Sequence, residues 1–205
     1  MKKISFFAYL FLLLNISFAF AQQKDDAYLL EIQAYQQELN TSYKSEEKTP
    51  LSKTDLANFK EHSFFDINKK YCIKTKIVKS KNEKPFGMPT TVGSKAEYVK
   101  YGEAHFKIDG KKYKLNIYQS VKVTKGYENY LFLPFRDLTN GTTTYEGGRF
   151  LDFKIPENDK NVVIDFNKAY NPYCAYSDNY ACPIVPKENS LSIEILSGIK
   201  LLGKK

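Results

Sequence analysis

The fold is decided by residues 104–117, whose sequence is AHFKIDGKKYKLNI. Apolar residues alternate with polar ones up to Asp109-Gly110, and the alternation resumes after this dipeptide. A period of two is typical of a strand with one buried face, and Asp-Gly supplies the positive φ angles of a tight hairpin turn. The stretch therefore predicts two antiparallel strands joined by a two-residue turn.

More strands are expected on both sides of this hairpin, because short apolar or alternating runs are separated by glycine, proline and asparagine. The predicted strands cover residues 71–78, 130–135, 149–155, 161–166 and 191–195, with a last one at 199–202. No helical pattern lies between them. The sequence thus predicts a mostly β (α+β) fold, an antiparallel β-barrel or sandwich.

The beginning of the chain has a helical pattern instead. Apolar residues recur at two to four positions over residues 25–39, which favours an amphipathic helix. A second, short helix is expected after Pro50, where Ser52 or Thr54 can cap it. We therefore expect one or two N-terminal helices at about 25–62, followed by a β-rich part at 70–205. No repeat or linker divides residues 22–205, which predicts a single domain.

Residues 1–21 have the features of a secretory signal peptide. Lys2 and Lys3 precede an apolar run over residues 4–20, and Ala19-Phe20-Ala21 places small residues at the two positions that signal peptidase reads. Cleavage before Gln22 would leave 184 residues in the periplasm or outside the cell, without a transmembrane segment. The alternative is an uncleaved membrane anchor.

Composition narrows the function further. The 205 residues contain 2 His and 3 Cys, which argues against multi-histidine metal sites, and we expect no metal and no cofactor. The formal charge of +8 falls to +6 without Lys2 and Lys3, and the remaining lysines are scattered. A nucleic-acid-binding protein would gather such charge in one stripe, so no nucleic-acid partner is expected.

The cysteines indicate a disulfide if the chain is exported. Cys174 and Cys182 flank a turn-rich segment, and in an oxidising compartment such a pair most plausibly forms a disulfide. The competing interpretation is a redox-active or nucleophilic Cys174. Cys72 is left over, either as a free thiol at a sheet edge or as a link between chains.

A polar and aromatic cluster between residues 135 and 189 is the predicted functional region. Arg149 shares strand parity with Leu151 and Phe153, so its guanidinium is expected to point toward the core, where it needs a carboxylate or a bound anion. Asp165 is one candidate partner, and Asp137 and Asp152 are its competitors. Either an ion pair fixes the strands, or Arg149 holds a small anionic ligand.

Other chemistries fit this region less well. The Asp165-x-Asn167 spacing resembles the start of a calcium loop, but Ala169, Tyr170 and Tyr176 stand where later ligands or glycine belong. No G-x-S-x-G element supports a serine hydrolase. An extracytoplasmic hydrolase would have to use His105 or Asp165 as its base.

Three motifs resemble the bacterial DUF1684 family, in a variant with a signal peptide. They are FRDLTNGTTTYEGGRFLD at 135–152, VIDFNKAYNPYCAY at 163–176 and CPIVPKEN at 182–189. The resemblance covers about Tyr98 to Gly198 and implies a shared fold and site without an activity. The motif positions carried over are Asp137, Thr139, Gly141, Thr144, Tyr145, Gly148, Arg149, Asp165, Asn167, Tyr170, Asn171, Cys174, Cys182 and Asn189.

The function expected from the sequence is an exported module that binds a small ligand or a partner, with an anionic small molecule as the expected ligand. Its candidate site residues are Arg149, Asp165, Asn167, Tyr145, Tyr170, Asn171 and Asp137. The scarcity of histidine favours binding over catalysis. The alternatives are the hydrolase and a purely structural surface protein.

Overall fold

The structure, a computed structural model, describes residues 6–47, 49–123 and 125–201. The chain divides into two compact units, residues 1–39 and 40–205. Helix α1 covers Phe6–Tyr43, and the division between the two units falls after Leu39, near its C-terminal end. The predicted helix at 25–39 is confirmed and is longer than expected. The predicted cleavage after Ala21 stays a prediction, and residues 1–5 of the predicted signal lie outside the described residues.

Within the described residues, no helix combines the length and the apolar character needed to cross a membrane.

The second unit opens with the short helix that the sequence predicts. Helix α2 covers Lys53–Asn58, and the hydroxyl of Ser52 accepts a hydrogen bond from the backbone N–H of Asp55 at 3.1 Å. Ser52 is therefore the N-cap, as its residue type favours. Short 3-10 helices are η1 (Lys69–Tyr71), η2 (Phe166–Lys168), η3 (Tyr173–Ala175) and η4 (Lys187–Asn189).

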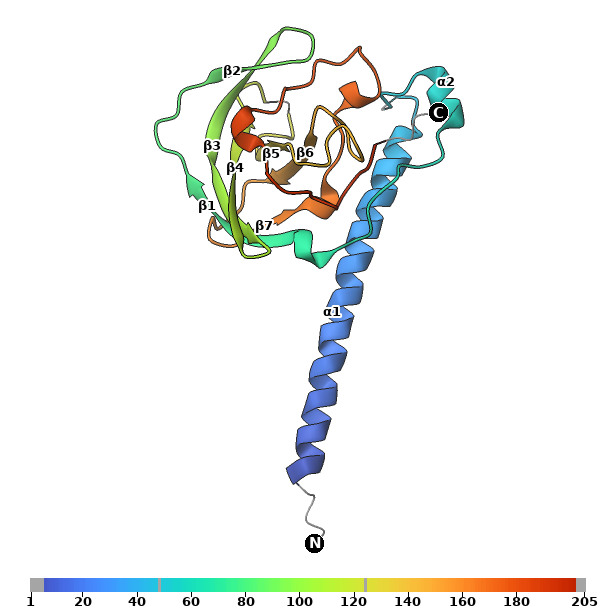
Figure 1. The fold of residues 1–205 in the computed structure, drawn as a ribbon, viewed down its shortest axis with the longest axis vertical. Helices are drawn as coiled ribbons and strands as arrows, with labels where there is room; N and C mark the ends of the chain where they lie inside the picture. Colours follow the sequence, from blue (N-terminus) through green and yellow to red (C-terminus); the bar gives the residue numbers. More distant parts are fainter. Residues whose placement is uncertain (1–5, 48, 124, 202–205) are drawn as a thin grey trace. The chain divides into compact units, whose positions relative to one another are not determined.

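A 7-stranded antiparallel sheet, curled into a half-barrel, forms the body of this unit (Figure 1). The strands are β1 (Cys72–Lys79), β2 (Phe86–Pro89), β3 (Lys95–Ile108), β4 (Lys111–Ser120), β5 (Tyr130–Phe135), β6 (Arg149–Lys154) and β7 (Val162–Asp165). Their order is β6-β5-β4-β3-β1-β7, and β2 pairs with β3. The predicted mostly β (α+β) class is confirmed.

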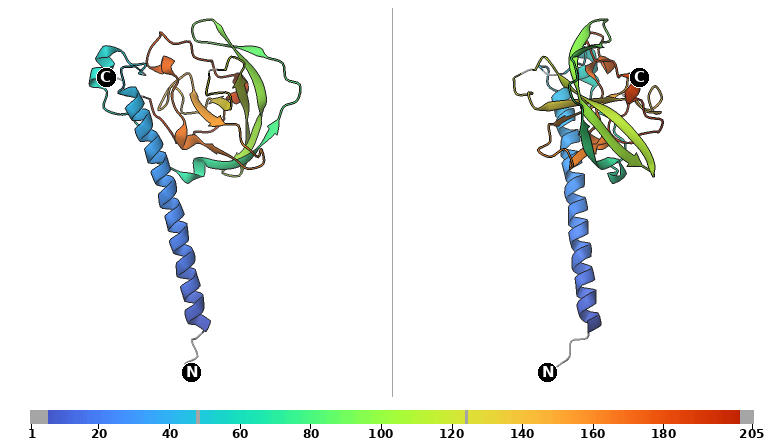
Figure 2. Two further views of the ribbon diagram at one scale, coloured as in Figure 1. Left: turned by 180° about the vertical axis from the view of Figure 1, so that it is seen from behind. Right: turned by 90° about the vertical axis from the view of Figure 1, so that its left-hand side faces the viewer.

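The hairpin at residues 104–117 is confirmed in detail. Ile108 pairs with Lys111, so Asp109 and Gly110 alone form the turn, with φ angles of 49° and 77°. Figure 2 shows β3 and β4 as a long twisted hairpin. This is the longest ladder of the sheet, and β1 and β5 pair with its two edges.

The hydrophobic core lies on one face of the sheet. Alternate residues of each strand are buried there, as the period of two predicts. They include Ile73, Ile77, Phe106, Ile108, Leu115, Ile117, Leu131, Leu133, Phe135, Leu151 and Ile164.

The C-terminal segment differs from the prediction. Residues 191–195 form no regular strand, although Leu191 and Ile195 are buried as expected. The carbonyl of Ile195 accepts a hydrogen bond from the Arg149 side chain, so this segment uses its backbone polar groups without strand pairing there. Ile199 forms an isolated bridge with Phe64 instead of a strand, and the end of the predicted strand at 199–202 lies outside the described residues.

Candidate functional site

Arg149 lies in the core, as its strand parity predicts, and its side chain is 0% exposed. Its Nη2 lies 2.8 Å from Oδ2 of Asp137 and donates to the carbonyl of Ile195 at 2.8 Å. Nη1 donates to the carbonyls of Ser197 and Ile199. Burial lowers the pKa of Arg149, and the negative charge of Asp137 opposes this shift. The guanidinium therefore holds the C-terminal segment against β6, and its charge is compensated within the protein.

The turn before β6 requires a glycine beside the inward arginine. Gly148 has a φ of 98°, which only glycine adopts readily. A Cβ atom at this position would lie 2.6 Å from the carbonyl oxygen of Phe135. The close approach of the two backbones leaves room only for glycine.

Asp165 and Asn167 lie in a turn. Asp165 Oδ1 accepts hydrogen bonds from the backbone N–H and the side-chain amide of Asn167, at 3.0 and 2.8 Å, and so caps η2. Asn167 Oδ1 accepts from the Ser197 hydroxyl at 2.8 Å and from the N–H of Asn68 at 2.9 Å. These contacts connect β7 with two distant segments and do not bring Asp165 to Arg149, whose carboxylate partner is Asp137.

Tyr145 and Asn171 lie apart from Arg149 and line a cavity of about 300 Å³. The Tyr145 hydroxyl lies 3.8 Å from Cys174 Sγ, and burial with this thiol raises the pKa of Tyr145. The Asn171 amide donates to the Tyr176 hydroxyl at 3.1 Å, and its Oδ1 is buried without a hydrogen-bond partner among the described residues.

The predicted disulfide is absent from the structure, in which the sulfur atoms of Cys174 and Cys182 are not bonded to each other. The two residues are neighbours, because the backbone N–H of Cys174 donates to Cys182 Sγ at 3.1 Å. Hydrogen bonding with Cys182 lowers the pKa of Cys174 to about 7 and raises the pKa of Cys182. Sequence spacing correctly placed the two thiols together, but it does not report whether they are oxidised.

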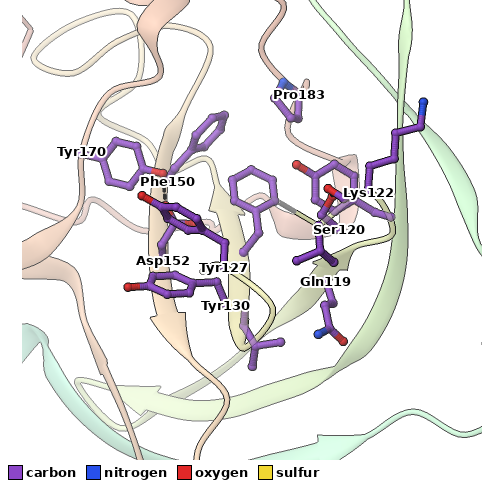
Figure 3. A pocket seen from close by; sticks show the side chains of 13 residues that line it. Gln119, Ser120, Lys122, Tyr127, Tyr130, Phe150, Asp152, Tyr170 and Pro183 are labelled. Atoms are coloured by element: carbon purple, nitrogen blue, oxygen red, sulfur yellow. Dashed lines mark hydrogen bonds between the residues drawn. The ribbon is translucent and has the colours of Figure 1, made fainter. Parts of the chain in front are cut away.

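Tyr170, another predicted site residue, lines a separate aromatic pocket of about 350 Å³ (Figure 3). Its rings are those of Tyr98, Tyr127, Tyr130, Phe132, Phe150 and Tyr170. Phe132 packs edge-to-face on Phe150 with ring centroids 4.8 Å apart, and Tyr98 stacks on Phe132 at 5.4 Å. We call this cavity the aromatic pocket.

Asp152 supplies a carboxylate to the aromatic pocket. The hydroxyl of Tyr170 donates to Asp152 Oδ2, and Figure 3 shows this carboxylate among the tyrosine rings. The side chain stays accessible to solvent, although the surrounding protein partly desolvates it and raises the pKa of Asp152. Burial, with a contribution from the charge of Asp152, raises the pKa of Tyr98 to about 12. Tyr98 therefore stays a neutral phenol beside the carboxylate.

The register of the sheet builds the aromatic pocket on the face opposite the core. Phe132 pairs with Asp152 and Tyr118, whereas the adjacent Leu133 pairs with Leu151 on the core face. Sequence reasoning missed this site because it assigned only one apolar face to each strand. The signal was present: β5 and β6 carry large apolar residues at both parities, which is unusual for a strand with one solvated face.

His105 lies away from these places. Its Nε2 is 2.9 Å from Glu103 Oε2 on β3, and its side chain is 47% exposed. The cavity that it lines is otherwise formed by residues 74–76 and 160–163, outside the motif cluster apart from Val163. The geometry therefore gives no support to His105 as a base acting on that cluster.

These features define a class of protein: an antiparallel half-barrel with a buried arginine in its core, bound to the C-terminal segment, and an aromatic pocket on its opposite face. The chain belongs to the family described as "Protein of unknown function (DUF1684)", which it matches over residues 57–200. This confirms the family resemblance seen in the motifs.

The comparisons with individual proteins add a fold and no activity. No protein with curated information matches the chain. The solution NMR structure of an uncharacterized protein from gene locus rrnAC0354 of Haloarcula marismortui is similar, with a TM-score of 0.68 and 24% identity. The similarity covers 87% of this chain and 96% of the other, and it shows a shared fold.

Proposed function

We propose that the chain is a small-ligand binding module and that its site is the aromatic pocket. The observation that carries the proposal is the composition of this cavity, in which rings from several strands surround one solvent-accessible carboxylate, Asp152. A volume of about 350 Å³ is within the range of small-molecule sites, which are mostly apolar with a few placed polar groups. Tyr170 belongs both to the predicted residue set and to this pocket.

This location differs from the site around Arg149, Asp165 and Asn167 that the sequence suggests. The Arg149 guanidinium is 0% exposed and paired with Asp137, so it is not open to an anionic small molecule. Asp165 and Asn167 use their side chains to join segments of the chain. Their contacts support a structural role, and the proposal therefore leaves them outside the binding site.

Native mass spectrometry of the full chain, purified from its own cells, tests the proposal. We expect a retained small molecule on the wild-type protein and its loss from Ser120→Trp, which places an indole in the aromatic pocket. Leu138→Trp is the matched control, because Leu138 is 60% exposed and does not line the pocket. If the wild-type protein carries no molecule and Ser120→Trp behaves like the control, the purely structural alternative replaces this proposal.

We also propose that the chain is exported to the periplasm or the cell exterior, where Cys174 and Cys182 form a disulfide. The support is the basic start, the apolar run and the Ala19-Phe20-Ala21 ending of residues 1–21, together with the adjacent thiols. N-terminal sequencing of the protein recovered outside the cytoplasm should begin at Gln22. A chain found only in the cytoplasm with Met1 in place would refute export.

A further inference from the structure

The walls of the aromatic pocket contain two groups of contacting aromatic rings. Phe150 contacts Phe132 at 4.8 Å and Tyr170 at 6.0 Å between ring centroids, in both cases edge-to-face. Tyr127 and Tyr130 form another ring pair at 4.9 Å, and Tyr127 is 58% exposed. Aromatic ring faces carry partial negative charge and attract cations. The pocket therefore offers several such rings around one cavity.

The carboxylate of Asp152 adds a negative charge to the partial negative charge of the ring faces. Asp152 accepts a hydrogen bond from the Tyr170 hydroxyl, which carries no positive charge, and it has no salt bridge among the described residues. Lys122 is the basic residue of the lining, but Figure 3 shows its side chain extending away from the rings. Within the described part of the chain, no cation thus compensates this carboxylate.

We infer that the aromatic pocket selects an organic ammonium group, in which a positive charge is surrounded by alkyl substituents. The alkyl groups fit the apolar ring walls, and the positive charge complements both the ring faces and Asp152. An anion would meet repulsion there, and a neutral sugar would leave the carboxylate uncompensated. This inference rests on the proposed function and names the ligand class of the same site.

Isothermal titration of the full chain with choline tests the inference, with 3,3-dimethylbutan-1-ol as the neutral compound of the same shape. We expect choline to bind at least roughly tenfold more tightly than the alcohol, because only choline gains the cation–π and carboxylate attraction. Asp152→Asn should lower this preference, because only the cation–π attraction then remains, and it should leave the affinity for the alcohol within about twofold. Asp178→Asn, at an exposed position outside the pocket lining, makes the same charge change and should keep it.

The possible failures are distinguishable. Equal affinities for choline and the alcohol, unchanged by Asp152→Asn but abolished by Ser120→Trp, would overturn the ammonium inference and leave the small-ligand site standing. Absence of binding by both compounds, together with absence of a retained molecule in native mass spectrometry, would overturn both proposals. A choline preference as large in Asp152→Asn as in the wild type would overturn the role of the carboxylate.

The ammonium group could belong to a free metabolite or to a lipid headgroup, and a vesicle arm separates these sources. Co-sedimentation with phosphatidylcholine vesicles that depends on Asp152 would support the inference with a lipid source. Binding of choline without vesicle binding would support it with a free ligand. Vesicle binding that is equal in the wild type and in Asp152→Asn, without choline binding, would count against it.

Discussion

Two charged residues of β6, Arg149 and Asp152, lie three positions apart and therefore on opposite faces of the sheet. Arg149 finds Asp137 and three carbonyls within the protein. Asp152 finds one phenol hydroxyl and an open cavity. A charge with an internal partner contributes to the fold, whereas an accessible charge without one is available to a ligand. The quoted stretch 135–152 contains both residues, but only Arg149 is among the motif positions carried over from the family.

Removal of the internal partner should have the largest effect. Asp137→Asn leaves the Arg149 charge buried without a counter-charge, and we expect a loss of about 3–5 kcal/mol in the free energy of unfolding. Urea denaturation of the variant measures this loss. Asp178→Asn, on an exposed residue, should change the stability by less than about 0.5 kcal/mol. A similarly small effect for Asp137→Asn would show that the buried pair does not hold the fold.

His62 is a third kind of polar group, because it is buried without a partner and also closed to ligands. Its side-chain nitrogens have no hydrogen-bond partner among the described residues, and rings such as Tyr43, at 4.3 Å between centroids, surround it. Burial lowers its pKa from 6.5 to about 4. Between these values the unfolded chain holds the proton and the folded chain does not, so acidification favours unfolding.

We therefore expect the wild-type protein to lose about 3 kcal/mol of stability through His62 as the pH falls from 6.5 to 4. Unfolding measured across this range should be less pH-dependent in His62→Phe, which keeps a ring and removes the titration. If His62→Phe has the same slope as the wild type, the imidazole does not unfold the protein on protonation.

Cys174 and Cys182 also have a partner within the protein, because each contacts the other. On a Cys72→Ser background, oxidised glutathione should convert Cys174 and Cys182 to a disulfide, with loss of two hydrogen atoms from the protein and formation of two glutathione thiols. Closing this short loop should raise the stability by roughly 2–3 kcal/mol in the chain-entropy model. Mass spectrometry and denaturation before and after oxidation measure both effects. A stable mixed disulfide at Cys174 without the internal bond would contradict the prediction.

Local patterns in the sequence are sufficient for the hairpin and the inward direction of Arg149, since each depends on residues close together in the chain. They leave the cap of α2 open between Ser52 and Thr54, and the structure has Ser52. The partner of Arg149 was left open among three aspartates, because the choice depends on how β6 meets the turn after β5. The segment at 191–195 has strand-like alternation, but its pairing was decided by contacts that are distant in sequence.

The aromatic pocket could not be assembled from the sequence for the same reason. Its rings come from β3, β5, β6 and two loops, and only the strand order places Tyr98, Phe132 and Tyr170 around one cavity. The motifs directed attention to buried polar residues such as Asn189, whose side chain bonds to Asn116 and Pro134 and serves the fold. Polar motif residues such as Asn189 thus make hydrogen bonds within the fold and do not line the aromatic pocket.

The smallest stability effect is the most informative for function. Asp152→Asn is the same chemical change as Asp137→Asn, but we expect a change of less than about 0.5 kcal/mol, or a gain in stability. Partial desolvation raises the folded-state pKa of Asp152 above 3.8, so the folded protein holds this proton more tightly than the unfolded chain does. Ionisation of Asp152 therefore lowers the free energy of unfolding of the wild type as the pH rises above 3.8. The asparagine variant has no such ionisation and keeps this stability.

Unfolding of Asp152→Asn and Asp137→Asn in parallel at neutral pH decides between the two roles on β6. A carboxylate that does not help the fold but whose neutralisation lowers the preference for an ammonium ligand has a functional reason to be there. A stability loss in Asp152→Asn as large as that in Asp137→Asn would instead make Asp152 a structural residue, and the contrast between the two faces of the strand would disappear.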